Sequence, residues 1–397
     1  MVLIMDSKKW NWQQDDWPNF TYDKEKIAQL EREYIQKAGI SFGIMKSLPQ
    51  AEQTQLAVEL ISDEALNTSE IEGEIFNRDS LQSSIMREFG LAAIIREART
   101  TPGEIGIAKM MKELYADYQH SLSHEMLFSW HDNLMLGNPK IKAGKYRTYK
   151  EDMQVVSGRI DKPKIHFVAP PSSRILQETN QLIDWFNRTA PGSKTPLQPL
   201  TRAGIAHFHF VTIHPFEDGN GRIGRALVTK VLSQSNKSPI LTAVSCTINQ
   251  DKKQYYKSLN AQNKSNEITP YLTYFSKAIL ESQRAMVEKL DFLIAKTKFF
   301  DAYKRNINHR QKKAILRIFQ EGSKGFDGGL SAKNYIAITK APKATATRDL
   351  TDLAKKGILI RTGKLKSTRY ELNLAPFNCA FNIGNNDDAS NNKISQN

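Results

Sequence analysis

The sequence predicts a mainly α-helical protein with one short β-hairpin near its middle and a small module of helices and strands toward its C-terminal end. Apolar residues recur at intervals of three and four over most of the chain, which is the spacing of amphipathic helices. In the middle third, the alternation typical of strands is confined to residues 144–171. Near Lys298 the pattern changes to three short helices followed by two strands. These observations indicate a helical core with appended smaller parts.

The composition is that of a globular protein. With 397 residues, 40% of them hydrophobic and 25% charged, the chain is long enough for two or three domains. The opening MVLIM is too short an apolar run for a signal peptide, and no later run approaches the roughly 20 apolar residues of a membrane span. The only cysteines, Cys246 and Cys379, have no metal-ligand or redox spacing. We therefore expect a cytoplasmic protein without membrane association.

Residues 1–110 are expected to form an N-terminal arm followed by a helical domain. The arm, WNWQQDDWPNFTYD at residues 10–23, mixes aromatic residues with turn formers, so we expect it to be irregular and to dock its tryptophans elsewhere. Helical periodicity then runs from Lys24 to about Arg99, and the sequence Thr-Pro-Gly at residues 101–103 interrupts it.

Residues 111–290 are expected to form the central domain. Alternation around Val155 and Val156, followed by the run IHFV, predicts a β-hairpin over residues 153–168. Helices resume at Ile175. The stretch LTRAGIAHFHFVTI is so apolar on all sides that it predicts a central, buried helix.

The C-terminal part carries most of the positive charge. Residues 301–372 contain 17 Lys and Arg against 6 Asp and Glu, a net charge of +11 out of +14 for the chain. After a linker helix at 291–305, three helices and a hairpin over residues 306–375 have the order of a winged helix-turn-helix domain. An Asn-rich tail at 376–397 is expected to be disordered.

This basic module can bind DNA through phosphate contacts. Residues 340–357 would supply the recognition helix, with Lys364, Lys366 and Arg369 on the wing. Protein contacts, or a basic face that is merely solvated, remain open as alternatives.

The stretch HPFEDGNGRIGR, residues 214–225, combines groups suited to phosphate chemistry. Glycines before a helix N-terminus let an anion approach the backbone N–H groups closely. Arg222 and Arg225 are three residues apart, so both can reach the same anion. Asp218 can hold a divalent cation such as Mg²⁺ that bridges phosphates, and His214 is placed to take a proton from an incoming hydroxyl.

Each of these residues has a structural alternative. A glycine-rich turn between helices occurs in many proteins without a ligand. A histidine beside an apolar helix is more often a core residue, which we expect of His207 and His209. The joint occurrence of base, metal ligand, glycines and arginines in this order favours the functional interpretation.

The stretch resembles, position for position, the HxFx(D/E)GNGRxxR signature of Fic-domain proteins, which transfer AMP from ATP to a hydroxyl of a target protein. The resemblance implies that His214 is the general base and Asp218 the Mg²⁺ ligand. It also implies a phosphate cradle and two contacts to the outer phosphates, made by Gly219, Asn220, Gly221, Arg222 and Arg225. Death-on-curing kinases of the same superfamily replace the GNGR portion, so its presence favours nucleotidyl transfer over phosphoryl transfer. Family members often form dimers, so a homodimer is a further expectation.

Two other regions match the family. The hairpin corresponds to the flap, which in the family aligns the target as an added strand, and its Val156 and Ser157 are expected to border ATP. An ordinary surface hairpin is the alternative. Tyr255, Tyr256 and Asn263 have the spacing of the residues that line the adenine side of the family's pocket. Without the resemblance they would be helix-packing residues.

The stretch TSEIEGE resembles the inhibitory (S/T)xxxE(G/N) motif of the family through Thr68, Glu72 and Gly73. Its place before the other motif is that of the class with an N-terminal inhibitory helix. The resemblance implies that Glu72 pairs bidentately with Arg225 where the γ-phosphate must bind, which leaves the α-phosphate off line for attack. A solvated acidic helix face is the alternative.

Two classes of function remain. The first is a protein adenylyltransferase that uses ATP and Mg²⁺ to modify a Ser, Thr or Tyr hydroxyl of a target protein or of itself. The second is a DNA-binding transcriptional regulator whose pocket only senses ATP. The histidine at position 214 favours the enzyme, because a sensor needs no base. Whether such an enzyme also removes AMP remains open.

Overall fold

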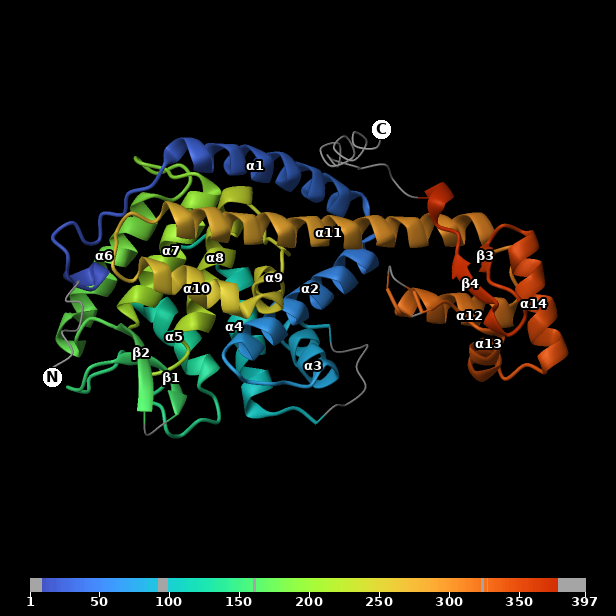
Figure 1. Cartoon of the computed structure of the whole chain (residues 1–397), viewed down its shortest axis with the longest axis horizontal. Helices are drawn as coiled ribbons and strands as arrows, with labels where there is room; N and C mark the ends of the chain where they lie inside the picture. The colour runs from blue at the N-terminus through green and yellow to red at the C-terminus, as the bar shows by residue number, and fades with distance from the viewer. Residues whose placement is uncertain (1–8, 92–98, 160–161, 323–324, 327, 378–397) are drawn as a thin grey trace, which may run out of the picture. The chain divides into compact units, whose positions relative to one another are not determined.

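The computed structural model describes residues 9–91, 99–159, 162–322, 325–326 and 328–377, and they are mainly helical with two small sheets (Figure 1). The predicted mainly α-helical class is confirmed. The expectations for the opening MVLIM and for residues 378–397 of the tail lie outside the described residues. Contacts divide the chain into two compact units, Met1–Met286 and Val287–Asn397.

The first unit contains the helices that surround the candidate site. Their bounds are α1 Lys24–Ser47, α2 Gln50–Ile71, α3 Arg78–Glu88, α4 Pro102–Ala116, α5 His124–Leu134, α6 Ile175–Arg188, α7 Pro199–Ile213, α8 Asn220–Asn236, α9 Val244–Gln250, α10 Lys252–Gln262 and α11 Thr269–Tyr303, the last of which crosses the boundary between the units.

Several helix starts follow from local sequence. The side chain of Asp23 accepts hydrogen bonds from the backbone of Glu25 and Lys26 and so caps α1. Thr101 and Glu104 form a capping box around Pro102 at the start of α4. The periodic segment that begins at Lys24 is divided, because Pro49 ends α1 and starts α2, and a turn at residues 72–77 precedes α3.

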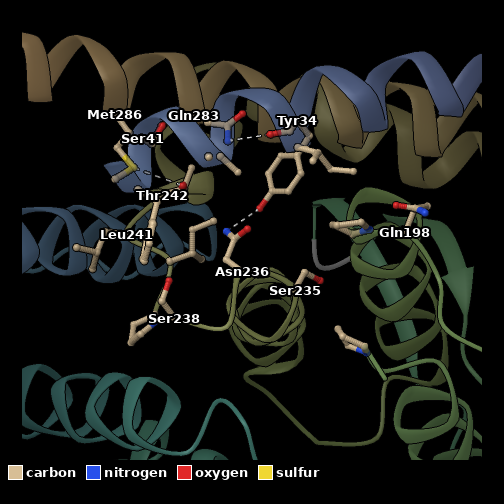
Figure 2. A pocket seen from close by; sticks show the side chains of 18 of the residues that line it. Tyr34, Ser41, Gln198, Ser235, Asn236, Ser238, Leu241, Thr242, Gln283 and Met286 are labelled. Atoms are coloured by element: carbon tan, nitrogen blue, oxygen red, sulfur yellow. Dashed lines mark hydrogen bonds between the residues drawn. The ribbon is translucent and has the colours of Figure 1, made fainter. Parts of the chain in front are cut away.

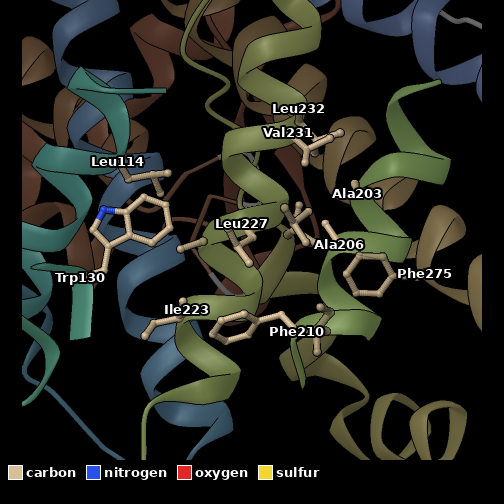
Figure 3. Close-up of a cluster of buried hydrophobic side chains, with 14 of the residues drawn as sticks. Leu114, Trp130, Ala203, Ala206, Phe210, Ile223, Leu227, Val231, Leu232 and Phe275 are labelled. Carbon is tan, nitrogen blue, oxygen red and sulfur yellow. The ribbon is translucent and has the colours of Figure 1, made fainter. Parts of the chain in front are cut away.

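Helix α7 is the centre of the first unit, as its apolar sequence predicts. Thirteen of its 15 residues are buried. Figure 3 shows Phe210 of α7 and Leu227 of α8 between Trp130 of α5 on one side and Phe275 of α11 on the other. Because α7 and α8 pack together along their length, the loop that joins them, residues 214–219, is held at a fixed place in the core.

The predicted hairpin is present as an antiparallel pair of strands, β1 Gln154–Arg159 and β2 Lys162–Val168. An irregularity in the register places Val155 opposite Phe167 and Val156 opposite Ile165, so His166 has no opposite residue in β1. We refer to residues 153–168 as the hairpin.

In the described part of the second unit, the end of α11 is followed by three helices and then two antiparallel strands, namely α12 His309–Gln320, α13 Ala332–Thr339, α14 Lys343–Lys355, β3 Leu359–Thr362 and β4 Arg369–Leu372. The buried carboxylate of Asp349 on α14 accepts hydrogen bonds from Arg310 on α12 and Tyr335 on α13, and so connects the three helices. Phe377 packs edge-on against Phe299 and Tyr303, so packed structure continues two residues beyond position 375.

Within the described residues, none of the helices is both long and apolar enough to pass through a lipid bilayer.

Candidate functional site

A cavity of about 400 Å³ is lined by seven of the fifteen predicted site residues. It is bounded by the hairpin, the end of α2, helix α7 and helix α10. The residues that line it and were predicted from the sequence are Glu72, Val156, His214, Gly221, Tyr255, Tyr256 and Asn263. Residues from five separate elements, including Gly221 at the start of α8, therefore meet at one site, and the volume is within the usual range of ligand pockets. Ser157 lies on β1, in the hairpin that forms one wall.

His214 ends helix α7 in a left-handed conformation, with φ 51° and ψ 58°. A residue with a Cβ adopts this conformation at a cost, so it must be held there by its surroundings. The ring Nδ1 lies 3.3 Å from the carbonyl oxygen of Val211, which assigns the proton to Nδ1. Nε2 makes no hydrogen bond to the residues that the structure describes. Burial lowers the pKa of His214 to about 4, so its imidazole is neutral at neutral pH.

The side chain of Arg147 holds the backbone of His214, and the sequence does not single it out. Its Nε–H donates to the carbonyl oxygen of His214 at 2.8 Å. Its Nη2 donates to the carbonyl of Pro170 at 2.5 Å, and its Nη1 donates to Ser172 Oγ at 3.1 Å. The guanidinium is buried, so its N–H groups must find their acceptors within the protein. Arg147 therefore fixes His214 to the segment that follows the hairpin.

The loop after His214 is shaped by its own polar groups. Asp218 Oδ1 accepts the N–H of Gly219 at 2.5 Å, and Gly219 has φ 81°, which favours glycine. The side chain of Asn220 accepts the N–H of Phe216 and donates to its carbonyl. The amide of Asn220 thus closes the loop through two hydrogen bonds to the backbone of Phe216. Helix α8 begins at Asn220, two residues before the predicted start near Arg222.

Arg225 is buried and faces the predicted inhibitory residues. Its Nη2 donates to Glu72 Oε1 at 2.7 Å. Its Nε and Nη2 donate to the hydroxyl and the carbonyl of Thr68, both at 2.8 Å. The expected two-point pairing with Glu72 is therefore wrong, because only one carboxylate oxygen bonds to Arg225 while Thr68 takes Nε and shares Nη2. Arg225 Nη1 is buried and makes no hydrogen bond within the described part of the chain.

Arg222 has a carboxylate partner that the sequence motif does not indicate. Its Nη1 donates to Glu74 Oε2 at 2.5 Å, and its Nη2 lies 3.4 Å from Asp218 Oδ1. Burial and nearby Asp218 raise the pKa of Glu74, against the opposing effect of Arg222. Asp218 and Arg222 line a second cavity of about 520 Å³, together with Glu72, Gly73 and Glu74. Glu72 borders both cavities.

The residues of the predicted adenine side also hold neighbouring backbone. The hydroxyl of Tyr256 donates to the carbonyl of Ile71, the last residue of α2, at 3.3 Å. Asn263 Nδ2 donates to the carbonyl of His166 in the hairpin at 3.0 Å. Tyr255 is buried, and its hydroxyl lies 3.0 Å from the ring of His207.

The two other histidines of α7 are buried, as expected of core residues. Both ring nitrogens of His207 have partners, the hydroxyls of Tyr255 and Tyr271. His209 differs from this expectation, because its Nε2 makes no hydrogen bond to the described residues. Burial lowers the pKa of each to about 3, so neither carries charge at neutral pH.

The arrangement fits an anionic ligand. Arg225 Nη1 and Arg222 Nε are buried donors that the described residues leave unpaired, and such donors are rare without a ligand. Asp218 is about half exposed and offers a carboxylate beside them. Within the described residues there is no group of three or more metal-binding side chains. Mg²⁺ commonly uses one or two carboxylates plus substrate phosphates, so the site fits a cation that arrives with its ligand.

A larger cavity of about 630 Å³ lies elsewhere in the first unit, between α1, α11 and the loops before α7 and after α8. In Figure 2 Tyr34 and Asn236 point toward one another across it, joined by a hydrogen bond of 3.3 Å. All the residues that line this cavity are uncharged, so it lacks the cations that a phosphate site requires.

Comparison with known proteins agrees with this geometry. Residues 121–232 match the model of the Fic/DOC family, and residues 10–91 match a domain of unknown function, DUF4172. Protein adenylyltransferase fic-1 of Caenorhabditis briggsae is 29% identical over 164 residues, 41% of this chain and 28% of that protein. Protein adenylyltransferase Fic of Nematostella vectensis is 23% identical over 266 residues, 64% of this chain and 55% of that protein. The chain thus spans little more than half of these relatives at most.

A solved structure shares the fold more broadly. The crystal structure of a Fic family protein from Desulfovibrio desulfuricans G20 superposes with a TM-score of 0.51 at 22% identity, and covers 88% of this chain and 96% of that chain.

Proposed function

We propose that this chain, which carries a Fic domain over residues 121–232, is a protein adenylyltransferase that transfers AMP from ATP to a hydroxyl side chain of a target protein or of itself. The observation that carries the proposal is His214, which lines the cavity with an imidazole that is neutral at neutral pH and whose Nε2 makes no hydrogen bond to the described residues. A site that only senses ATP needs no such base. ATP labelled at its α-phosphorus should label the chain, whereas ATP labelled at its γ-phosphorus should not. Transfer of the γ-label instead would refute the proposal.

The reaction assigns one role to each group. Nε2 of His214 takes the proton of a Ser, Thr or Tyr hydroxyl as its oxygen attacks the α-phosphorus of ATP. The new O–P bond forms, the bond from the α-phosphorus to the bridging oxygen breaks, and pyrophosphate leaves. Arg222, Arg225 and the backbone N–H groups at the start of α8 offset the charge that develops on these oxygens. Asp218 would hold Mg²⁺, which supplies further positive charge at the phosphates.

Glu72 is proposed to restrain this reaction. Its carboxylate occupies Nη2 of Arg225, and a Cβ at position 221 would clash with it, so Gly221 gives the carboxylate its place beside the phosphate loop. Helix α10 also holds the end of α2 in place, because Lys252 and Tyr256 both donate hydrogen bonds to the carbonyl of Ile71. While Glu72 stays there, a γ-phosphate cannot bind Arg225 productively.

The hairpin is proposed to act as the flap that aligns the target. The carbonyls of His166 and Val168, two residues apart in β2, face one edge of the strand, and Asn263 and Trp12 donate to them. The backbone of Gln154 to Val156 in β1 makes no comparable hydrogen bond outside the hairpin among the described residues. A target segment would therefore add to the edge of β1.

Replacing Arg147 with lysine is expected to lower both stability and rate. Lysine keeps the charge but cannot reach the carbonyls of His214 and Pro170 together, and a buried acceptor left without a donor costs about 1–3 kcal/mol. With Glu72→Gly present, we expect the AMP-transfer rate to fall by about tenfold or more, measured with labelled ATP. Arg202→Lys is the matched control, because Arg202 is also buried and donates to the carbonyl of Phe186 away from the site. An equal loss of rate in both variants would contradict the role of Arg147.

We also propose that the second unit is a winged helix that binds DNA through helix α14. The exposed face of α14 presents Lys343, Arg348 and Lys355 with small side chains between them, while Asp349 and Leu350 are buried. Cationic side chains along one face of a helix suit contacts to the phosphate backbone.

The full chain is therefore expected to shift mixed-sequence duplex DNA in a gel at low salt, and to release it as salt is raised. Reversing the charge of Lys343 and Arg348 should weaken binding and reduce the slope of log affinity against log salt by about 0.9 per lost phosphate contact. Reversing the exposed Lys140 and Lys194 of the first unit changes net charge equally and is the control. No shift at low salt, or an equal effect of both pairs, would contradict DNA binding by α14.

A further inference from the structure

The N-terminal arm, residues 10–22, lies in the domain of unknown function and touches both walls of the candidate site. Its first contact is with the hairpin. The indole N–H of Trp12 donates to the carbonyl of Val168, the last residue of β2, at 2.7 Å. Trp12 is buried with Phe167 and Ala169 in a small cluster, and the ring of Trp10 meets that of Phe167 edge-on at 5.4 Å. Phe167 in turn lines the cavity.

The second contact of the arm is with the segment that follows helix α10. The backbone N–H of Asn11 donates to the carbonyl of Asn263 at 2.9 Å, and the side chain of Gln14 donates to the carbonyl of Lys264 at 2.8 Å. The ammonium of Lys264 lies over the ring of Trp10. The side chain of Asn263 reaches the hairpin through the carbonyl of His166. Arm, hairpin and α10 thus form a closed ring of contacts around one side of the cavity.

The hairpin needs contacts of this kind from outside its own two strands to stay in place. A two-stranded hairpin is marginally stable alone, and Val156 and Ile165 of this one are about half exposed. The bulge leaves His166 without an opposite residue in β1, and β2 ends at Val168. Asn263 and Trp12 satisfy these two carbonyls and cover the outer edge of β2.

We propose that the arm is a positioning segment. It holds the hairpin over the cavity so that the hairpin can align a target segment with its hydroxyl beside His214. This inference rests on the proposed adenylyltransferase function, but its physical content, the bracing of the hairpin by Trp12, is independent of that function. The arm does not touch reacting atoms. It acts through the hairpin and through Asn263.

Two matched substitutions separate bracing from general stabilisation. Trp12→Phe keeps an aromatic ring and removes the hydrogen bond to Val168. Trp17→Phe makes the same change in the same arm, but the bond lost there is the one from the Trp17 indole to Glu178 on α6. Each variant loses one hydrogen bond, and only the first loses a bond to the hairpin.

The measurements are amide hydrogen exchange of residues 153–168 in the full chain and AMP transfer from labelled ATP in the Glu72→Gly background. Trp12→Phe is expected to lower protection of the hairpin by about fivefold to tenfold, the size expected for one hydrogen bond, and to lower the transfer rate with it. Trp17→Phe is expected to leave hairpin exchange unchanged at a similar melting temperature. The proposal is overturned if Trp12→Phe leaves hairpin protection at the parent level, or if both variants lower it equally. If Glu72→Gly transfers no AMP at all, the proposed enzyme function fails, while hydrogen exchange still decides whether the arm braces the hairpin.

Discussion

Replacing Glu72 with glycine is expected to raise AMP transfer by about tenfold to a hundredfold. The carboxylate holds Nη2 of Arg225 at 2.7 Å, and its removal frees a second donor beside the unpaired Nη1 for the γ-phosphate. A charge-assisted hydrogen bond contributes about 1.5–3 kcal/mol, which corresponds to that range of rates. The measurement is the initial rate of label transfer from ATP labelled at its α-phosphorus, at saturating Mg²⁺.

Glu70 provides the control for this experiment. It lies two residues earlier, and its carboxylate accepts a hydrogen bond from Asn249 rather than from an arginine of the site. Glu70→Gly should therefore leave the rate at the parent level. Equal rates for the parent chain and Glu72→Gly would remove the basis for restraint by Glu72. Activation by both substitutions would point to a general loosening of α2.

Replacing His214 with alanine in the Glu72→Gly background is expected to lower the rate by about a hundredfold to ten thousandfold, the usual contribution of a general base. The loss should lie in the chemical step, because the arginines and the start of α8 that bind phosphate stay in place. Single-turnover rates and equilibrium binding of ATP measure the two steps separately.

The outcome for binding is as informative as the outcome for rate. Glu72→Gly with His214→Ala should bind ATP within a few-fold of Glu72→Gly alone. A rate within a few-fold of Glu72→Gly would show that His214 is not the base. A large loss of ATP binding would assign His214 to the pocket rather than to proton transfer.

The parts of the site that the sequence predicts are those encoded locally. His214, Gly219 and Arg225 lie in one short stretch whose order fixes the turn, and the apolar pattern places α7 in the core. The pairing of Glu72 with Arg225 is expected only from the resemblance of the stretch TSEIEGE to the inhibitory motif, and no local pattern predicts it. The sequence also does not predict how many hydrogen bonds join Glu72 and Arg225, because Thr68 accepts hydrogen bonds from the same guanidinium.

Residues that act from distant elements leave no local signal. Arg147 is 67 positions from His214, and Trp12 is 156 positions from Val168. An arginine between tyrosine and threonine, or a tryptophan in a polar arm, is compatible with many environments. Glu74 resembles any acidic residue after a helix until the fold places Arg222 beside it. Asn220 is a motif residue expected to contact the ligand. In the structure its side chain instead makes two hydrogen bonds to the backbone of Phe216.

Intact-mass spectrometry of the purified chain after incubation with ATP and Mg²⁺ tests the central claim most directly. The account predicts that Glu72→Gly gains the mass of one or more AMP groups, that the parent chain gains far less, and that Glu72→Gly with His214→Ala gains none. A mass increase of a phosphate instead of AMP, or no adduct on Glu72→Gly after prolonged incubation, would contradict it.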